Sequence, residues 1–243
     1  MRLNEDGTIG EMTDEIFHKG IGSVAERNFR PHVNCVNITP DQKYLCAVDL
    51  GVDQVKIYKF NDETGKITLV DMLRCELESA PRIIKFSPDG RFAYLICELK
   101  NYISVYSYKD GPRGPVFELV QTISTLNEYH SKGSAACVLR FSRDWNYVLC
   151  SNAGDNSVGI FKIDRETGML EKICILPVSG DYPKAADFFP DNRHIMALNH
   201  ESNTMTIFRI NYEKKYFSLW GKPLKVETPN CVLVSEIEEA PKQ

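Results

Sequence analysis

The chain has 243 residues, of which 43% are hydrophobic and 26% are charged, and this composition is typical of an ordinary globular protein. Its formal net charge of −4 provides no basic field for nucleic-acid binding, so no nucleic-acid partner is expected. The first residues, MRLNEDGTIGEMTDE, are too polar for a signal peptide, and no apolar run reaches membrane-spanning length, so no membrane partner is expected.

The eight cysteines are scattered along the chain, most of them inside apolar segments. No two of them form a C-x-x-C pair, so the sequence contains neither a zinc knuckle nor a redox motif. We therefore expect no metal and no cofactor. Cysteines of this kind are typical of buried, reduced thiols, which predicts a cytoplasmic protein.

Four segments repeat one pattern in chain order, an apolar strand followed by a polar turn and a second, alternating strand. They are AVDLGVDQVKIYKF (47–60), LICELKNYISVYSY (95–108), CSNAGDNSVGIFKI (150–163) and ALNHESNTMTIFRI (197–210). A strand and a turn such as PDQK or PDGR precede each hairpin, and a fourth strand follows turns such as NDETG and DRETG. Four short antiparallel strands in each unit of about 50 residues predict an all-β fold, a β-propeller.

We expect residues 1–243 to form a single, partial β-propeller domain. Complete four-stranded blades are predicted at residues 32–81, 82–135, 136–183 and 184–230. Residues 7–15 match a fourth strand and residues 231–236 match a first strand. First and fourth strands lie at opposite edges of a blade, so these two orphan strands cannot complete one blade together.

The runs PHVNCVNITPDQKYLCAVDLGVDQVKIYKF, APRIIKFSPDGRFAYLICEL and SNAGDNSVGIFKID resemble the seven-bladed lactonase propellers. These are the propeller-type 6-phosphogluconolactonases, which are related to carboxymuconate lactonizing enzymes. Seven blades at this period need roughly 340 residues, so we expect an N-terminally truncated member of the family. The resemblance implies a lactone hydrolase that converts 6-phospho-glucono-1,5-lactone to 6-phosphogluconate in the pentose phosphate pathway.

In an antiparallel blade, the starts of first strands and the ends of second strands share one face, opposite the PDG-type and ETG turns. Strand starts on that face carry His32, Arg82 and Lys184. Strand ends carry Asp49, Glu98, Asn152 and Asn199, and adjoining turns carry Asp53, Asp155 and His200. Opening a lactone needs a base for water and a donor for the oxyanion, and a sugar phosphate needs further cations. We therefore expect this face to bind a sugar-phosphate lactone.

The family's motifs imply roles for several of these residues. By that match, Glu98 or His32 is the catalytic base and Arg82 faces carboxyl or phosphate oxygens. The predicted substrate-binding residues are Lys184, Asp49, Asn152, Asn199 and Asp155. Four positions depart from the family's pattern, namely Ala153 for Arg, Lys184 for Arg, Ile83 for His and Cys97 for Asn. His18, His130 and His194 are expected to be surface residues.

Other functions remain open at this stage. The chain could be a non-catalytic or decayed propeller that acts as an interaction scaffold, which Ala153 and the missing blades favour, or a muconate-type cycloisomerase. An Asp or Asn at a strand end is about as often a turn former that bonds its own backbone. The open blade edges also predict self-association, because unpaired strand edges invite pairing.

Overall fold

The computed structural model describes residues 1–23, 28–128 and 133–235. It divides into two compact units, Met1–Lys100 with Ser104–Val120 and Asn101–Ile103 with Gln121–Gln243. Every sheet is antiparallel, and the described residues contain no α-helix. This confirms the predicted all-β fold, which is built from four-stranded sheets of the propeller type.

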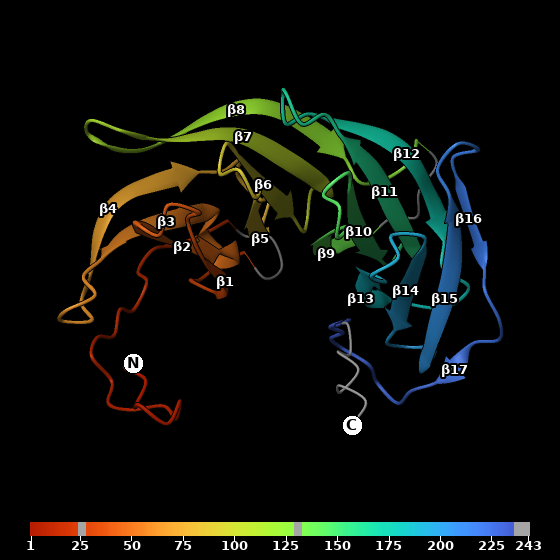
Figure 1. The fold of residues 1–243 in the computed structure, drawn as a ribbon, viewed down its shortest axis with the longest axis horizontal. Helices are drawn as coiled ribbons and strands as arrows, with labels where there is room; N and C mark the ends of the chain where they lie inside the picture. The colour runs from red at the N-terminus through yellow and green to blue at the C-terminus, as the bar shows by residue number, and fades with distance from the viewer. Residues whose placement is uncertain (24–27, 129–132, 236–243) are drawn as a thin grey trace, which may run out of the picture. The chain divides into compact units, whose positions relative to one another are not determined.

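The first unit contains two sheets, whose strands follow one another in chain order (Figure 1). The first sheet comprises β1 (Val33–Ile38), β2 (Tyr44–Asp49), β3 (Gln54–Phe60) and β4 (Ile67–Arg74), with the short 3₁₀ helix η1 (Leu50–Val52) between β2 and β3. The second sheet comprises β5 (Pro81–Phe86), β6 (Phe92–Cys97), β7 (Tyr102–Gly111) and β8 (Gly114–Ser124). The division between the units falls within β7 and β8.

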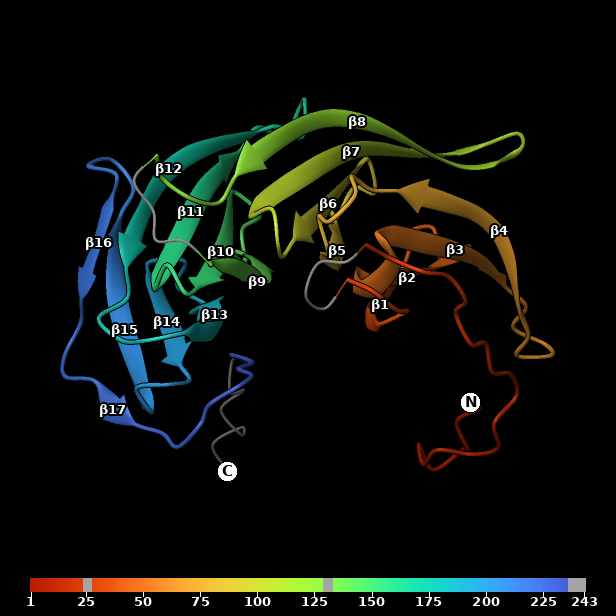
Figure 2. The same ribbon diagram turned by 180° about the vertical axis from the view of Figure 1, so that it is seen from behind.

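The second unit repeats this arrangement, as the reverse view shows (Figure 2). The third sheet comprises β9 (Ala135–Phe141), β10 (Tyr147–Ala153), β11 (Ser157–Ile163) and β12 (Leu170–Pro177). The fourth comprises β13 (Pro183–Phe188), β14 (His194–Asn199), β15 (Thr204–Asn211) and β16 (Tyr216–Leu219). An additional short strand, β17 (Leu224–Lys225), pairs with β15 beyond the end of β16.

The two predicted orphan strands do not form in the described residues. Between residues 7 and 15, only Ile9 makes a β-bridge, an isolated one to Leu3. Residues 231–235 belong to no strand, and residue 236 lies outside the described part of the chain. The physical reason is that a strand needs a backbone ladder, and among the described residues neither segment forms one with a strand of its unit.

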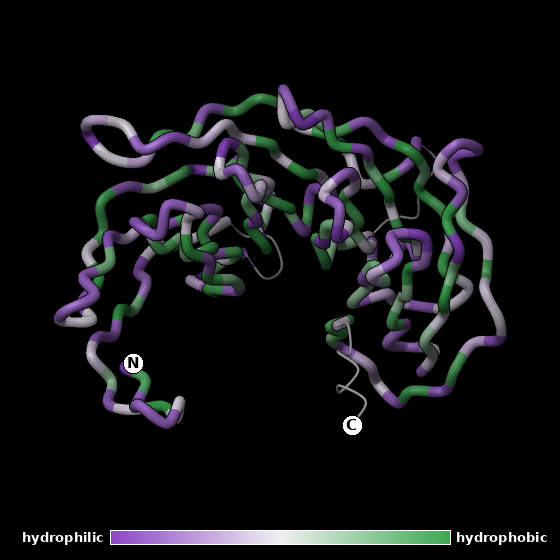
Figure 3. Tube along the Cα trace, viewed as in Figure 1, coloured by the Kyte–Doolittle hydropathy of each residue, from purple (hydrophilic) through white to green (hydrophobic). Residues whose placement is uncertain are grey.

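Apolar residues are frequent along the strands (Figure 3), and second strands such as β6 are buried along their whole length. In the second unit, Leu149 and Ile160 of the third sheet pack in one cluster with Ile195 and Phe208 of the fourth. In the first unit, Ile84 at the middle of β5 is fully buried. In the second unit, apolar strand residues therefore hold the third and fourth sheets together.

One turn geometry recurs between the second and third strands of every sheet. Its last residue has a left-handed backbone and is always Asp or Asn, with φ of 54° at Asp53, 52° at Asn101, 54° at Asn156 and 55° at Asn203. Asn and Asp tolerate this conformation better than most residues. The four backbone carbonyls accept hydrogen bonds of 2.9–3.0 Å. The donors are Cys75, Thr125 and Val178, each of which follows a fourth strand, and Val226, which follows β17.

The side chains of the same four residues bind the segment that leads away from their sheet. Asp53 accepts hydrogen bonds from the backbone of Glu78 and Ala80, just before β5. Asn156 accepts one from Tyr182, just before β13. Asn101 donates to the Ser134 carbonyl, and Asn203 accepts from Thr228. These four residues, which we call the Asx clamps, fix where each following segment begins.

Candidate functional site

Strand register defines three equivalent positions at the end of each sheet where the first strand begins, which we call the entry end. The pre-strand position lies at the start of the first strand and is held by His32, Ala80, Ala135 and Tyr182. The post-strand position lies opposite it, at the end of the second strand, and is held by Leu50, Glu98, Ala153 and His200. The backbone pairs that join the two positions are Leu50 to His32, Glu98 to Ala80, Ala153 to Ala135 and His200 to Tyr182.

The third position is a β-bulge, because the first strand of every sheet carries one extra residue there. The register shifts lie between Val33 and Cys35, between Pro81 and Ile83, opposite Ser151 and Asn152, and between Pro183 and Ala185. The bulged residues are therefore Asn34, Arg82, Cys137 and Lys184. Bulges re-aim the side chain that they carry and are over-represented beside active sites.

Arg82 and Glu98 form the main polar contact at the entry end of the second sheet. The Arg82 guanidinium donates a hydrogen bond to Glu98 Oε2 and forms an ion pair with it. The Glu98 side chain is 1% exposed and that of Arg82 is 27% exposed. The Glu98 backbone is fixed by a 2.8 Å hydrogen bond to the Ala80 carbonyl. The structure therefore brings together Glu98, one of the two predicted bases, and Arg82, which was predicted to face carboxyl or phosphate oxygens.

His32 belongs to the same unit and lies at the entry end of the first sheet. Its backbone N–H donates to Asp49 Oδ1 over 2.7 Å, while its side chain is exposed. Nearby, the Asn34 side chain donates to the Arg82 carbonyl over 3.1 Å, so the starts of β1 and β5 lie against each other. His32 is thus an accessible imidazole at the same end of the first unit as the Arg82–Glu98 pair.

Asp49 is fully buried, and its carboxylate has structural partners. It caps η1 by accepting from Gly51, and it also accepts the His32 N–H. Its other oxygen, Oδ2, lies 2.6 Å from His18 Nδ1, and the Tyr58 hydroxyl lies 2.9 Å from His18 Nε2. Burial, followed by the nearby Asp49 charge, raises the pKa of Tyr58. Both carboxylate oxygens of Asp49 therefore have partners within the first unit, and Asp49 holds the N-terminal segment against the first sheet.

The prediction that His18 is a surface residue is wrong, because its side chain is only 5% exposed. His18 lies in a segment without regular secondary structure, so no strand pattern in the sequence indicated its burial. His194, also predicted at the surface, is half-buried and lies 2.5 Å from Asp191 Oδ2 in the turn before β14. His130 lies outside the described residues.

Asn152 and Asn199 are fully buried at equivalent ladder positions in the second unit. The Asn152 amide donates to the Thr125 carbonyl over 2.8 Å and to the Ser157 hydroxyl over 3.0 Å. The Asn199 amide donates to the hydroxyls of Thr204 and Thr206, each over 3.1 Å. Both amides therefore tie their hairpins together below the surface.

Asp155 stands in the turn between β10 and β11. Its Oδ2 accepts a 2.6 Å hydrogen bond from the Ser157 hydroxyl, which in turn lies 3.0 Å from the Asn152 amide. Asp53, which the sequence also placed in a turn beside the site, is an Asx clamp and is buried. The polar residues of these turns therefore have structural roles in joining strands and sheets.

Lys184 lies at the bulge position of the fourth sheet and is half-buried. Its Nζ donates to Asn230 Oδ1 over 3.2 Å and lies 5.7 Å from the centroid of the Tyr182 ring. The third sheet offers no polar group at its three entry-end positions. There Ala135, Cys137 and Ala153 form a small apolar cluster, against which Tyr182 packs.

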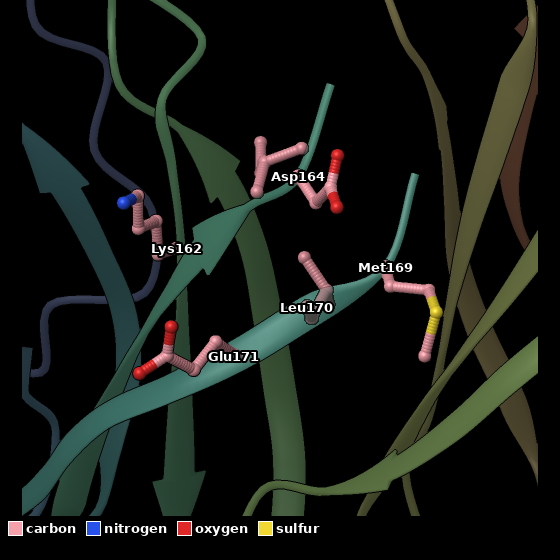
Figure 4. Close-up of a pocket in the computed structure, with 6 residues that line it drawn as sticks. Lys162, Asp164, Met169, Leu170 and Glu171 are labelled. Atoms are coloured by element: carbon pink, nitrogen blue, oxygen red, sulfur yellow. The ribbon is translucent and has the colours of Figure 1, made fainter. Parts of the chain in front are cut away.

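The hollow drawn in Figure 4 lies away from these residues, at the turn between β11 and β12. Its volume is about 520 Å³, and it is lined by Lys162, Ile163, Asp164, Met169, Leu170 and Glu171. This turn is at the opposite end of the third sheet from its entry end, and Glu171 is paired with Lys215 over 3.0 Å. The hollow therefore does not contain the predicted site.

Neither a metal centre nor a membrane span is found in the part of the chain that the structure describes. No three His, Cys, Asp or Glu side chains there are grouped so that they could hold a metal ion. None of the described helical segments is long and apolar enough to cross a membrane. The candidate chemistry of the described residues therefore rests on the side chains at the entry ends.

Comparisons with known proteins agree with the fold. A family model described as "Lactonase, 7-bladed beta-propeller" matches residues 1–234. The 6-phosphogluconolactonase of Bacillus subtilis is 27% identical over 230 residues, which cover 95% of this chain and 64% of that protein. An uncharacterized protein of Lactococcus lactis is 32% identical over 232 residues, which cover 96% of this chain and 66% of that one.

Solved structures are similar over almost the whole chain. A periplasmic gluconolactonase of Pseudomonas aeruginosa superposes with a TM-score of 0.85 at 26% identity, covering 94% of this chain and 63% of that one. A protein from Lactobacillus plantarum superposes with a TM-score of 0.83 at 27% identity, covering 93% and 64%. This chain spans 58% to 66% of the length of the three curated relatives that head the comparison.

Proposed function

The chain belongs to the lactonase family of seven-bladed β-propellers, and on that premise we propose that it is a lactone hydrolase. The observation that carries the proposal is the contact between Arg82 and Glu98 at the entry end of the second sheet. The name of the Bacillus subtilis relative supports 6-phospho-glucono-1,5-lactone as the substrate, with 6-phosphogluconate as the product. The reaction would then belong to the pentose phosphate pathway.

In the proposed mechanism, Glu98 is the general base and Arg82 stabilises the oxyanion. Glu98 takes a proton from water as the water oxygen attacks the lactone carbonyl carbon. Arg82 donates from its guanidinium to the carbonyl oxygen as that oxygen becomes negative. The carbon–ring oxygen bond then breaks, and the ring oxygen must receive a proton. His32, exposed at the same end of the first unit, can supply that proton.

The third sheet favours a second candidate function, that of a non-catalytic scaffold. Its entry-end positions are held by Ala135, Cys137 and Ala153, which form an apolar cluster with no carboxylate, imidazole or cation among them. For the location we propose the cytoplasm, which the eight free thiols support, although the Pseudomonas aeruginosa neighbour is named a periplasmic protein.

The proposal is tested by hydrolysis of freshly prepared 6-phosphoglucono-1,5-lactone, followed by acid release above the spontaneous rate. Glu98→Gln removes the base and keeps the volume of the side chain, so kcat should fall about 10²–10⁴-fold. Arg82→Lys should mainly raise KM, because an ammonium cannot reproduce the planar fork of the guanidinium.

The matched control is Glu171→Gln, which also removes one carboxylate from an ion pair, but at the other end of a sheet. It should retain the activity of the unmodified chain, and circular dichroism should show all variants folded. If Glu98→Gln is as active as Glu171→Gln, Glu98 is not the base. If the unmodified chain does not accelerate hydrolysis, the hypothesis of a non-catalytic scaffold is favoured.

A further inference from the structure

The second and fourth sheets place different charges at the same three entry-end positions. The second sheet has Ala80, Arg82 and Glu98, so its cation is neutralised by its own carboxylate. The fourth sheet has Tyr182, Lys184 and His200 at these positions. His200 stands where Glu98 stands in the second sheet, and a histidine cannot neutralise a lysine. Among these three positions of the fourth sheet, Lys184 therefore has no carboxylate partner.

The partners of Lys184 are all neutral among the described residues. They are the Asn230 side-chain oxygen and the Tyr182 ring, and no ion pair to Lys184 is formed in that part of the chain. Asp187, on the same strand, is paired with Arg140 over 3.7 Å. Asp181 accepts a hydrogen bond from Asn156. The ammonium is thus held in place without being compensated.

Tyr182 has a backbone conformation that is unusual for an aromatic residue, with φ of +60°. Two backbone contacts hold it there, a 2.8 Å bond to Asn156 Oδ1 and a 3.0 Å bond from the His200 N–H. Ala80, its counterpart in the second sheet, adopts the same conformation with φ of +53°. The repeat therefore needs the backbone conformation at this position but does not need an aromatic ring.

The ring of Tyr182 has a specific neighbourhood. It packs on the apolar cluster of Ala135, Cys137 and Ala153 and presents its face to the Lys184 ammonium. An aromatic face attracts a cation without removing its charge. Tyr182 and Asn230 together can therefore fix the ammonium in position while leaving its charge available to a ligand.

We infer that the entry end of the fourth sheet is an anion subsite, in which Lys184 binds the phosphate group of a sugar phosphate and Tyr182 positions Lys184. A compact ammonium suits a phosphate oxygen, and a bond to a charged group is stronger than a neutral one. The choice of a sugar phosphate, rather than another anion, rests on the proposed function. Within this subsite, Tyr182 is a positioning residue because it acts through Lys184.

The test measures binding of glucose 6-phosphate and of glucose to the full chain by isothermal titration calorimetry. Neither sugar is hydrolysed, so the result does not depend on lactone turnover or on Glu98. Lys184→Met should weaken glucose 6-phosphate binding on the order of tenfold, the typical effect of losing one contact to a charged group, and leave glucose binding unchanged. Lys162→Met, at the opposite end of the third sheet (Figure 4), is the matched control and should have no effect.

Two substitutions of Tyr182 separate positioning from folding. Tyr182→Phe keeps the ring and should bind glucose 6-phosphate like the unmodified chain. Tyr182→Leu removes the ring face and should weaken glucose 6-phosphate binding without affecting glucose. The inference is overturned if Lys184→Met binds glucose 6-phosphate as tightly as Lys162→Met does, or if the unmodified chain does not prefer glucose 6-phosphate to glucose.

Discussion

Replacing Asp53 with alanine should destabilise the first unit by at least about 4 kcal/mol, because this side chain alone serves several buried donors. Its carboxylate accepts 2.8 Å hydrogen bonds from the backbone of Glu78 and Ala80 and a 3.0 Å bond from the Asn28 amide. Each buried donor left without an acceptor costs about 1–3 kcal/mol. Alanine at a φ of 54° adds roughly 1–2 kcal/mol, since the left-handed region is unfavourable for a residue with a Cβ.

Asp53→Asn is the matched control, since asparagine is the natural residue at this position in the other three sheets. It keeps one acceptor oxygen and tolerates the left-handed conformation, so its loss should be about half that of Asp53→Ala. Urea unfolding, with hydrogen exchange of the β5 amides as a local probe, gives the free energies. The reasoning is refuted if Asp53→Ala lies within about 1 kcal/mol of the unmodified chain, or if the two substitutions cost the same.

Two further predictions concern the thiols and the face of β1. Burial raises the pKa of Cys46 and Cys150 to about 12, from 9.0 when unfolded, so at pH 8 a maleimide should label the exposed Cys231 well before either of them. As the pH rises, these thiols ionise in the unfolded chain before they ionise in the folded chain. The free energy of unfolding should therefore fall between pH 9 and pH 12, by up to about 1.4 kcal/mol per pH unit for each thiol. A free energy of unfolding that does not change over this range would contradict their burial. Val36 on β1 is 55% exposed, while its counterparts Ile84, Leu139 and Ala186 are 0% exposed. Val36→Glu should therefore reduce the predicted self-association, measured by sedimentation velocity, without lowering stability. Unchanged sedimentation would exclude the Val36 face of β1 as the contact.

The fold could be predicted because the strand pattern, the turn residues and the repeat length all indicated a β-propeller. The period-two alternation defined the strands, and turns such as PDQK and DRETG separated them. The Asp or Asn at the end of each central turn is itself a conformational signal, since few residues adopt a left-handed backbone. The prediction of strands at residues 7–15 and 231–236 was wrong for a reason that the residue pattern of a single segment does not show. Their residues fit a strand, but a strand forms only where a second strand is available for pairing.

The candidate site was predicted less well, because topology places a residue at one end of a sheet without fixing the face to which its side chain points. Glu98 was grouped with Asp49, Asn152 and Asn199 as a strand end. Register shows that Cys97 is the true counterpart of those three residues, and that Glu98 lies one residue further along. In a strand, a shift of one residue moves a side chain to the opposite face. That single step separates residues that tie their own hairpins together from the Glu98 carboxylate, which is also buried but pairs with Arg82.

The four sheets differ in chemistry at the bulge position and are alike at the Asx clamps. Asp53 and its three counterparts differ little, because each must keep a left-handed backbone and bind the next segment. Asn34, Arg82, Cys137 and Lys184 share one backbone geometry, but they present an amide, a guanidinium, a thiol and an ammonium. Because the bulge leaves its residue unpaired, the side chain there can change without disturbing the ladder. The geometry therefore separates the two tasks, since the Asx clamps maintain the repeat while the bulges give each sheet its own chemistry.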